Sequence, residues 1–179
     1  MPLVGQMAPA FEMLSTKNLD SLEETVRLGD YRGKWLVMFF YPADFTFVCP
    51  TEILALQERL QEFRDLDAEV LGVSCDSVHS HKAWLGTPRS ENGLGGLDYP
   101  LAADFTKAVA REYDVLVEAT GQTLRGLFIV DPDGVLRYQV VHDMNIGRSV
   151  DETLRVLEAL QAGGLCPANW HPGEPLLKA

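Results

Sequence analysis

Apolar residues along this chain form short continuous runs, and these runs predict β-strands. Residues 35–41 are all apolar or aromatic, which is typical of a central strand that is covered on both faces of a sheet. Mainly apolar segments at residues 69–74, 126–130 and 135–141 predict three further strands. The segment 131–134, Asp-Pro-Asp-Gly, is a strong turn signal, so the last two strands are expected to form a hairpin.

Between these runs, apolar residues recur at helical spacing. Residues 50–65 carry an apolar residue at every third or fourth position, which predicts a helix, and the proline in its first position suits a helix start. Residues 78–85, 106–113 and 151–161 predict three further helices, the last of which ends before a pair of glycines. Residues 165–179 hold three prolines and are expected to be irregular.

The order of these elements predicts an α/β protein with a thioredoxin-like fold. Residues 1–30 are expected to hold a strand or two and a loop, and the chain then runs strand–helix–strand, which favours parallel strands joined by a right-handed crossover. The second half adds the antiparallel hairpin and a covering helix. We therefore expect a central mixed β-sheet flanked by helices, with a domain at residues 1–164 and an extended C-terminal tail at residues 165–179.

Composition and charge narrow the class of protein. The 179 residues suit one domain with a sizeable core. The chain has 15 basic and 26 acidic residues and a net charge of −11, which argues against nucleic acid or an anionic membrane as a partner. No apolar run approaches the ~20 residues that span a bilayer. The first five residues have neither a basic flank nor a long apolar stretch, so we expect no signal peptide and a cytoplasmic protein.

The three cysteines, Cys49, Cys75 and Cys166, are too few and odd in number to predict a disulfide scaffold. Cys49 has the most informative position, because it follows the predicted central strand and a short turn, and Pro50 follows it. It is therefore expected at the N-cap or in the first turn of a helix, where unpaired N–H groups and the helix dipole favour an anion. A thiol placed there is expected to be partly thiolate at neutral pH and a strong nucleophile.

A thioredoxin-type disulfide oxidoreductase is the first enzyme class that this position suggests, but its second cysteine is missing. The Cys-x-x-Cys motif of such enzymes would need a cysteine at position 52, where this chain has Glu52. Cys49 therefore needs a different resolving thiol, or none.

The residues around Cys49 resemble the active-site signature of the peroxiredoxins, in the pattern Pro42-x-x-x-Thr46-x-x-Cys49. The longer segment 44–52, Asp-Phe-Thr-Phe-Val-Cys-Pro-Thr-Glu, resembles that of the typical two-cysteine peroxiredoxins, which include the alkyl hydroperoxide reductase C subunits and thioredoxin peroxidases. The resemblance extends over roughly residues 4–172 and includes Cys166, at the place of the family's second cysteine. Further matching segments, in family order, are 72–77, 81–84, 124–130, 147–153 and 156–161.

This resemblance implies a thiol-dependent peroxidase that reduces hydrogen peroxide and organic hydroperoxides without a metal or an organic cofactor. Cys49 would be the peroxidatic cysteine, which attacks the peroxide and becomes a sulfenic acid. Thr46 would offer its hydroxyl to the thiol or the peroxide, and Pro42 would help to shield the thiolate from water. Arg125 would stabilise the thiolate and the charge on the leaving oxygen.

Three more residues complete the implied site. Glu52 would orient an arginine through an ion pair, and Arg148 would belong to the same network. Cys166 would be the resolving cysteine, contributed by the partner subunit of a homodimer, and unwinding of residues 46–54 would let the two sulfurs meet. The resemblance also implies a decamer of five dimers, and reduction of the disulfide by an external dithiol protein, either a thioredoxin-like protein or a flavoprotein disulfide reductase.

Each of these residues also has a plainer interpretation. In that interpretation Cys49 is a buried core thiol, Cys166 is a free surface thiol and Arg125 is an exposed strand arginine. Their joint occurrence in family order favours the peroxidase. A non-enzymatic alternative is a ring-forming holdase, or a redox relay that senses peroxide through Cys49.

Cys75, His79 and His81 are expected to have no chemical role. Cys75 follows the predicted strand at residues 69–74, and we expect an inert buried thiol there. The spacing of the three residues is not a zinc pattern, so the two histidines are expected to lie in a solvated loop or at a helix start.

Two departures from the resembled family concern over-oxidation of the reactive cysteine. Members that over-oxidise easily have a Gly-Gly-Leu-Gly loop and a C-terminal helix that ends in Tyr-Phe. Here Asn92 occupies the first place of that loop, and the thirteen residues after Cys166 contain no Tyr-Phe pair. We therefore expect easy unwinding near Cys49 and slow conversion to the sulfinic acid.

Overall fold

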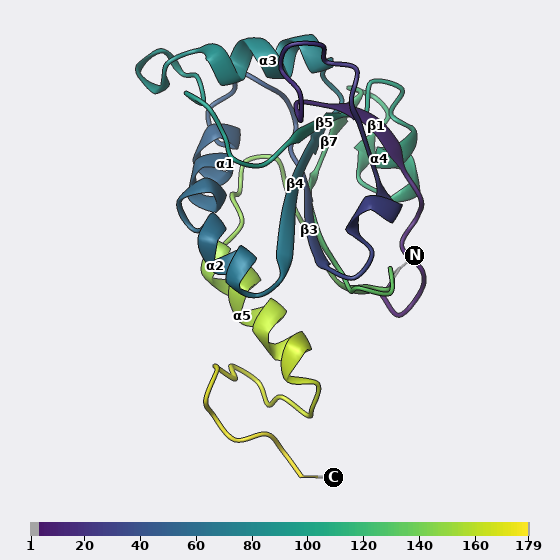
Figure 1. Cartoon of the computed structure of the whole chain (residues 1–179), viewed down its shortest axis with the longest axis vertical. Coiled ribbons are helices and arrows are strands. Elements are labelled where there is room, and N and C mark those ends of the chain that lie inside the picture. The colour runs from purple at the N-terminus through teal and green to yellow at the C-terminus, as the bar shows by residue number, and fades with distance from the viewer. Residues whose placement is uncertain (1–3, 179) are drawn as a thin grey trace.

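The computed structural model describes residues 4–178, and a mixed seven-stranded β-sheet forms the centre of this part of the chain (Figure 1). The strand order is β2-β1-β5-β4-β3-β8-β9, and β6 and β7 pair separately as a small antiparallel hairpin. The bounds are β1 Glu12–Ser15, β2 Thr25–Arg27, β3 Trp35–Phe40, β4 Ala68–Ser74, β5 Leu101–Ala103, β6 Leu116–Val117, β7 Gln122–Thr123, β8 Arg125–Val130 and β9 Leu136–His142. The predicted α/β fold with a central mixed sheet is confirmed.

β3 lies inside the sheet and is covered on both faces, as its continuous apolar sequence predicts. It pairs parallel with β4 and antiparallel with β8, and all residues from 36 to 40 are fully buried. β8 and β9 form the predicted antiparallel hairpin, whose turn is closed by hydrogen bonds that the Asp131 carboxylate accepts from the backbone. β9 forms one edge of the sheet.

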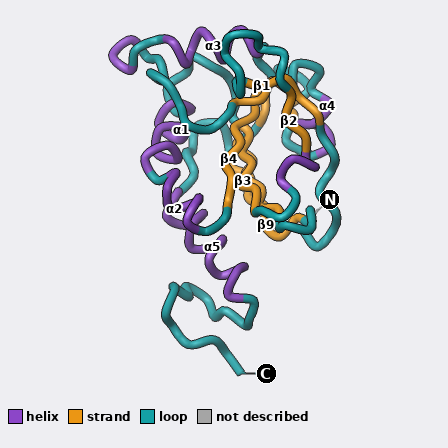
Figure 2. Tube along the Cα trace, in the orientation of Figure 1, coloured by secondary structure: helices purple, strands orange, loops and turns teal. Residues whose placement is uncertain are grey.

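Helices cover both faces of the sheet. Their bounds are α1 Cys49–Glu58, α2 Leu60–Asp65, α3 Val78–Gly86, α4 Ala108–Glu112 and α5 Val150–Ala162, with short 3-10 helices η1 Leu28–Tyr31 and η2 Arg89–Glu91. Buried residues of α1, α2, α3 and α5 share one core, and those of α4 and η1 share the core on the other face. Figure 2 shows the orange strands between these two sets of helices. In the described part of the chain, no helix has the length and apolarity that crossing a membrane requires.

The helix predicted at residues 50–65 is in fact two helices. α1 ends because Arg59 leaves the helical conformation, with φ −105° and ψ 10°, and α2 begins at the next residue. The helix predicted at residues 106–113 is shorter, because Lys107 has a φ of +63° just before α4 begins. β5 was not predicted from the sequence pattern, since a strand of three residues is too short to show a period.

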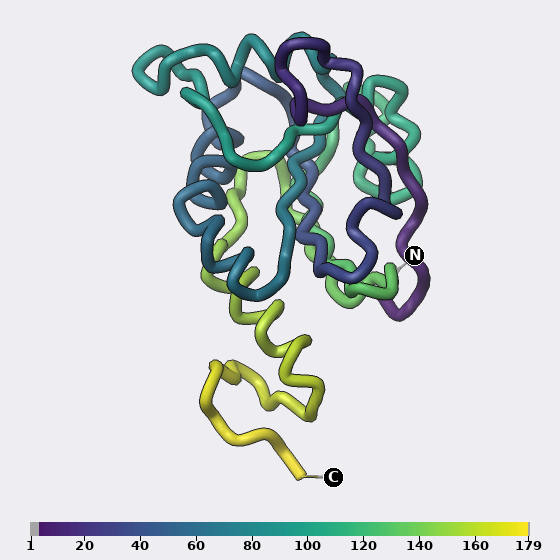
Figure 3. The backbone as a smooth tube through the Cα atoms, viewed as in Figure 1, coloured from purple at the N-terminus to yellow at the C-terminus, as the bar shows by residue number. Residues whose placement is uncertain are grey.

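The C-terminal tail begins where Gly163, with a φ of +68°, ends α5 in the left-handed conformation. Residues 164–178 contain no helix or strand apart from an isolated bridge between Leu165 and Leu177. Figure 3 shows this tail, in yellow, extending beyond the end of α5. The outer limits of the predicted domain and tail, residues 1 and 179, lie outside the described residues, and the division into two parts stays a prediction.

Candidate active site

Cys49 lies at the N-terminal end of α1, where the sequence predicts it. It is the first helical residue, Pro50 follows it in the first turn, and the N-cap residue Val48 makes no side-chain capping bond. The Cys49 side chain is completely buried. The positive end of the helix dipole therefore acts on a sulfur that is removed from water.

The site lies where two neighbouring strands, β3 and β8, separate. Their ladder ends at the pair Phe39–Leu127. One position further, the carbonyls of Phe40 and Gly126 both accept hydrogen bonds from Nη1 of Arg148, at 2.9 and 2.6 Å. The Arg148 guanidinium therefore takes the place of the next rung of the ladder and satisfies two buried carbonyls at the opening.

Glu52, in the first turn of α1, is bound by both arginines. Its carboxylate accepts hydrogen bonds from Nε, Nη2 and the backbone N–H of Arg148, at 2.7, 3.0 and 2.8 Å, and from Nη1 of Arg125 at 2.6 Å. Burial pushes the pKa of Glu52 upward, but the hydrogen bonds and charge of Arg148, together with the charge of Arg125, outweigh it, and the pKa lies below its ordinary value. Two guanidiniums thus surround one ionised carboxylate, and the buried cluster has a net positive charge.

Arg125 brings this positive charge to Cys49. Its Nη1 lies 3.4 Å from Cys49 Sγ, and its Nε donates to the Met144 carbonyl at 2.7 Å. The Arg125 side chain is only 3% exposed, so its interpretation as an exposed strand arginine is wrong. A guanidinium that is fixed in this way can stabilise a thiolate and any negative charge that develops beside it.

The loop that joins β3 to α1 is held in a strained conformation. Phe45 has a φ of +55°, which is unfavourable for an aromatic residue, and its ring packs against Trp84 with the centroids 5.8 Å apart. Thr46 donates its hydroxyl proton to the Ala43 carbonyl at 2.9 Å, so the lone pairs of Oγ1 remain available as acceptors. Asn92 Nδ2 donates to the Thr46 carbonyl at 3.2 Å and so ties a second loop to this one.

Pro42, Thr46 and Cys166 make no hydrogen bond to the Cys49 sulfur, to Glu52 or to either arginine within the described part of the chain. Pro42 is buried at the start of the loop, and Thr46 bonds within the loop. Cys166 is half-buried in the tail, with its Sγ 3.6 Å from the Ala159 carbonyl, and lines a hollow of about 630 Å³ between α5 and the tail. The tail lies beyond the end of α5, whereas α1 begins on the side of α3, so the two cysteines of one chain are apart (Figure 1).

A buried polar network supports the same loop, and sequence reasoning missed it. The Asp44 carboxylate accepts hydrogen bonds from the hydroxyls of Tyr41 at 2.9 Å and Ser80 at 2.7 Å, and lies 2.8 Å from Nδ1 of His81. The other ring nitrogen of His81 lies 3.2 Å from the Ala102 carbonyl. His81 is completely buried in the first turn of α3, so the predicted helix start is confirmed for it and the alternative of a solvated loop is wrong.

Cys75 follows β4 and is half-buried against the core, so the predicted buried thiol is less buried than expected. Burial, and then the charge of Asp104, raises the pKa of Cys75 to about 11. The group is therefore a protonated thiol at neutral pH and a poor nucleophile. His79 is exposed on α3, and within residues 4–178 no group of three His, Cys, Asp or Glu side chains could hold a metal ion.

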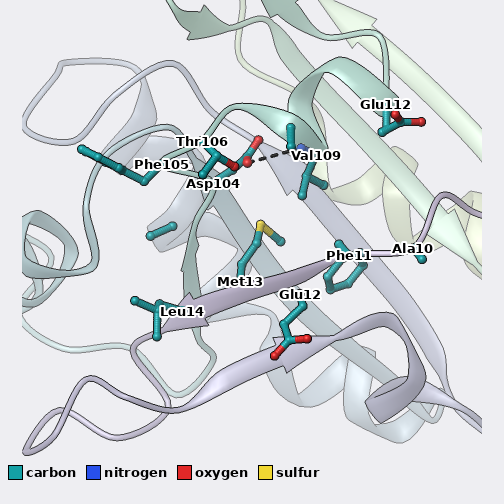
Figure 4. A pocket seen from close by; sticks show the side chains of 12 residues that line it. Ala10, Phe11, Glu12, Met13, Leu14, Asp104, Phe105, Thr106, Val109 and Glu112 are labelled. Atoms are coloured by element: carbon teal, nitrogen blue, oxygen red, sulfur yellow. Dashed lines mark hydrogen bonds between the residues drawn. The ribbon is translucent and has the colours of Figure 1, made fainter.

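A second hollow, of about 380 Å³, lies between β1 and α4 (Figure 4). Its apolar lining includes Phe11 and Met13, which belong to the core on the face of the sheet opposite Cys49. The Asp104 carboxylate in its wall is already occupied, because it accepts hydrogen bonds from the backbone N–H groups at the start of α4. No cysteine lines this hollow, so it does not compete with Cys49 as the reactive centre.

Comparison with known proteins relates the chain to one family. Residues 4–139 match the AhpC/TSA family. The chain is 60% identical over 180 residues to the protein YkuU of Bacillus subtilis, with 98% of each chain covered. It is 52% identical over 173 residues to the mitochondrial thioredoxin-dependent peroxide reductase of Drosophila melanogaster, with 94% of this chain and 73% of that one covered. The solved structure of the reduced 2-Cys peroxiredoxin of Plasmodium vivax has a TM-score of 0.93 and 38% identity, and the match covers 98% of this chain and 92% of that one.

Proposed function

Because the chain belongs to the AhpC/TSA family as a typical two-cysteine peroxiredoxin, and is thus a thiol-specific peroxidase, we propose that Cys49 is its peroxidatic and Cys166 its resolving residue. One observation carries the assignment of Cys49. Nη1 of Arg125 lies 3.4 Å from Cys49 Sγ at the start of α1, within a buried cluster of net positive charge. The substrates are hydrogen peroxide and organic hydroperoxides, and the thiols themselves do the chemistry.

In the first step the Cys49 thiolate attacks the terminal oxygen of the peroxide. An S–O bond forms and the O–O bond breaks, and the second oxygen leaves with the electron pair as hydroxide or alkoxide, which takes up a proton. The peroxide is thereby reduced to water or an alcohol, and Cys49 is oxidised to a sulfenic acid. Arg125 stabilises the negative charge first on the sulfur and then on the leaving oxygen.

The other predicted residues position these groups. Since the Thr46 hydroxyl gives its proton to the backbone, its lone pairs can accept a hydrogen bond from the O–H of the peroxide. Glu52 and Arg148 hold the Arg125 guanidinium in place through their shared ion pairs. Pro42 is buried and has no N–H, so it helps to keep water away from the sulfur.

In the second step, Cys166 of the partner subunit attacks the sulfur of the Cys49 sulfenic acid. The S–O bond breaks, hydroxide leaves and is protonated to water, and an intersubunit disulfide forms. Because Cys49 is completely buried in the first turn of α1, residues 46–54 must unwind before the two sulfurs meet. A dithiol protein then reduces the disulfide. Thioredoxin is the first choice, because the Drosophila relative is a thioredoxin-dependent peroxide reductase, and a flavoprotein disulfide reductase is the alternative.

The homodimer that this step requires has a suitable surface at the edge of the sheet. β9 pairs with β8 on one side and is the last strand of the sheet on the other. Residues 5–7 pair with Val135 and Leu136 at the start of this strand, and we propose that two copies join their sheets along the rest of β9, since an edge strand is a template for a second strand. We further propose that five such dimers form a decamer and that the enzyme works in the cytoplasm.

Peroxide treatment of the purified, reduced protein tests this mechanism. Wild type, Cys49→Ser, Cys166→Ser and the control Cys75→Ser receive an equimolar amount of hydrogen peroxide and are run on a non-reducing denaturing gel. We expect a dimer band in wild type and Cys75→Ser and none in the other two variants. Peroxide consumption by wild type without a dimer band would contradict the intersubunit step. Undiminished consumption by Cys49→Ser would contradict the assignment of the peroxidatic residue.

A further inference from the structure

A buried hydroxyl next to the site has no part in the steps above. Thr123 lies in β7, two residues before Arg125, and is completely buried. Removing a hydroxyl from water is costly unless it makes a hydrogen bond. Its Oγ1 donates to the carbonyl of Tyr41 at 2.9 Å.

Tyr41 is the residue at which the chain leaves β3 and enters the loop before α1. Its backbone N–H donates to the Val73 carbonyl at 3.0 Å, and its hydroxyl donates to Asp44 at 2.9 Å. With the bond from Thr123, each polar group of this buried residue has a partner. Three hydrogen bonds, to Val73, Asp44 and Thr123, therefore fix the start of the loop.

The bond between Thr123 and Tyr41 lies where the β3–β8 ladder opens. If the ladder continued beyond its last pair in the same register, Tyr41 would stand opposite Arg125. Instead, the Thr123 side chain satisfies the Tyr41 carbonyl, as Arg148 satisfies the two carbonyls one position earlier. Two side chains thus replace the rungs that a closed ladder would form.

We infer that Thr123 is a positioning residue, which acts on peroxide reduction through Arg125. Its bond ties the chain two residues before Arg125 to the start of the loop that leads to Cys49. The bond therefore helps to set the distance between the Arg125 guanidinium and the Cys49 sulfur, which is 3.4 Å from Nη1 to Sγ. A small displacement of that guanidinium would weaken its contact with the leaving oxygen, where catalysis depends on position. This inference rests on the proposed role of Arg125.

Substitutions at Thr123 separate the hydroxyl from the volume of the side chain. Valine fills the same space without a donor, whereas serine keeps the donor. The rate of Cys49 sulfenic acid formation with hydrogen peroxide, measured in a Cys166→Ser background, is expected to fall about tenfold in Thr123→Val and to change little in Thr123→Ser. Thr120→Val is the matched control and should leave the rate unchanged, because it removes an exposed hydroxyl between β6 and β7.

A double-mutant cycle with Arg125→Met tests whether Thr123 acts through Arg125. Adding Thr123→Val to Arg125→Met is expected to lower the rate by less than about twofold, because the two residues share one effect. Additive effects, or equal losses in Thr123→Ser and Thr123→Val, would overturn the positioning role and leave that of Arg125 intact. An unchanged rate in Arg125→Met would refute the proposed role of Arg125 and this inference with it. If Thr123→Val does not fold, Thr123→Ala gives the same comparison, with urea midpoints to show that each variant is folded.

Discussion

Replacing Glu52 by glutamine is expected to destabilise the protein, because two buried guanidiniums share the Glu52 carboxylate. Four hydrogen bonds, from 2.6 to 3.0 Å, reach its two oxygens, and the side chains of Arg125 and Arg148 are 3% and 5% exposed. A glutamine amide has one acceptor oxygen, and its NH₂ group is a donor that would face the N–H groups of the arginines. Glu52→Gln therefore leaves two buried positive charges without the carboxylate that they share.

The size of the loss follows from this burial. Removing one partner of a buried ion pair costs about 3 to 5 kcal/mol. Because the glutamine amide oxygen can still accept some of these hydrogen bonds, we expect a loss at the lower end of this range, about 3 kcal/mol in the free energy of unfolding. For a chain of this length, that loss corresponds to a Tm lower by about 6 to 12 °C.

The same substitution should remove part of the acid sensitivity of the fold. The pKa of Glu52 in the folded state lies below its ordinary value of 4.5, so the carboxylate stabilises the fold fully above that value. This contribution disappears as the pH falls through the folded-state pKa, when Glu52 takes up a proton. The stability of wild type should therefore fall more steeply below pH 4.5 than that of Glu52→Gln, and the two curves should approach each other.

Urea unfolding of the reduced proteins measures both effects, at one protein concentration and over a series of pH values from neutral to acid. Glu62→Gln is the matched control, because Glu62 pairs with Arg59 on the surface, and its midpoint at neutral pH should change little. A loss of less than about 1 kcal/mol in the free energy of unfolding of Glu52→Gln would refute the reasoning, since breaking a buried ion pair costs more than that. An unchanged acid dependence would refute it as well.

The strained loop, its buried support and the third cysteine can each be tested by one substitution. Asn92→Asp tolerates the φ of +62° but removes the donor to the Thr46 carbonyl, so the loop should unwind more easily. Mass spectrometry after excess peroxide should then find less sulfinic acid than in wild type, and an equal amount would contradict a role for this contact. His81→Phe removes a hydrogen-bond partner of the buried Asp44 carboxylate and should cost about 2 kcal/mol in urea unfolding. A loss below about 0.5 kcal/mol would contradict a stabilising role for this hydrogen bond. Cys75→Ser should leave turnover in a reductase-coupled assay unchanged, because a thiol with a pKa of about 11 is not ionised at neutral pH, and a slower enzyme would reveal a reactive role for it.

The four longest strands, β3, β4, β8 and β9, and the place of the reactive cysteine could be predicted because their signals are local. β3 is one continuous apolar run, and Pro50 directly after Cys49 indicates a helix start. The break at Arg59 could not be predicted, because the apolar spacing from Leu56 to Leu60 continues through it. Periodicity shows which face of a segment is buried, but it does not show where the axis of a helix changes.

The buried charges of the site could be predicted only where the family resemblance indicated them. Arg125 lies in an otherwise apolar strand, and a charged residue in such a place is ordinarily exposed. It is buried because Glu52, 73 positions earlier in the chain, meets it there. The family resemblance assigned no role to His81, and its polar neighbours in the sequence favoured a solvent-exposed position. It is buried because Asp44, 37 positions away, supplies an acceptor.

The opening between β3 and β8 explains why residues so far apart in the sequence act together. Where the ladder ends, each strand has a buried carbonyl that no longer has a partner in the neighbouring strand. The strands can stay separated there only because donors from other segments form hydrogen bonds with these carbonyls. Arg148, which follows β9, satisfies two of these carbonyls, and Thr123 of β7 satisfies a third. The same Arg148 guanidinium binds Glu52, which in turn holds Arg125 against Cys49. The local structure of the sheet and the positive charge at the sulfur therefore depend on the same interactions, and closing the opening would also withdraw the charge.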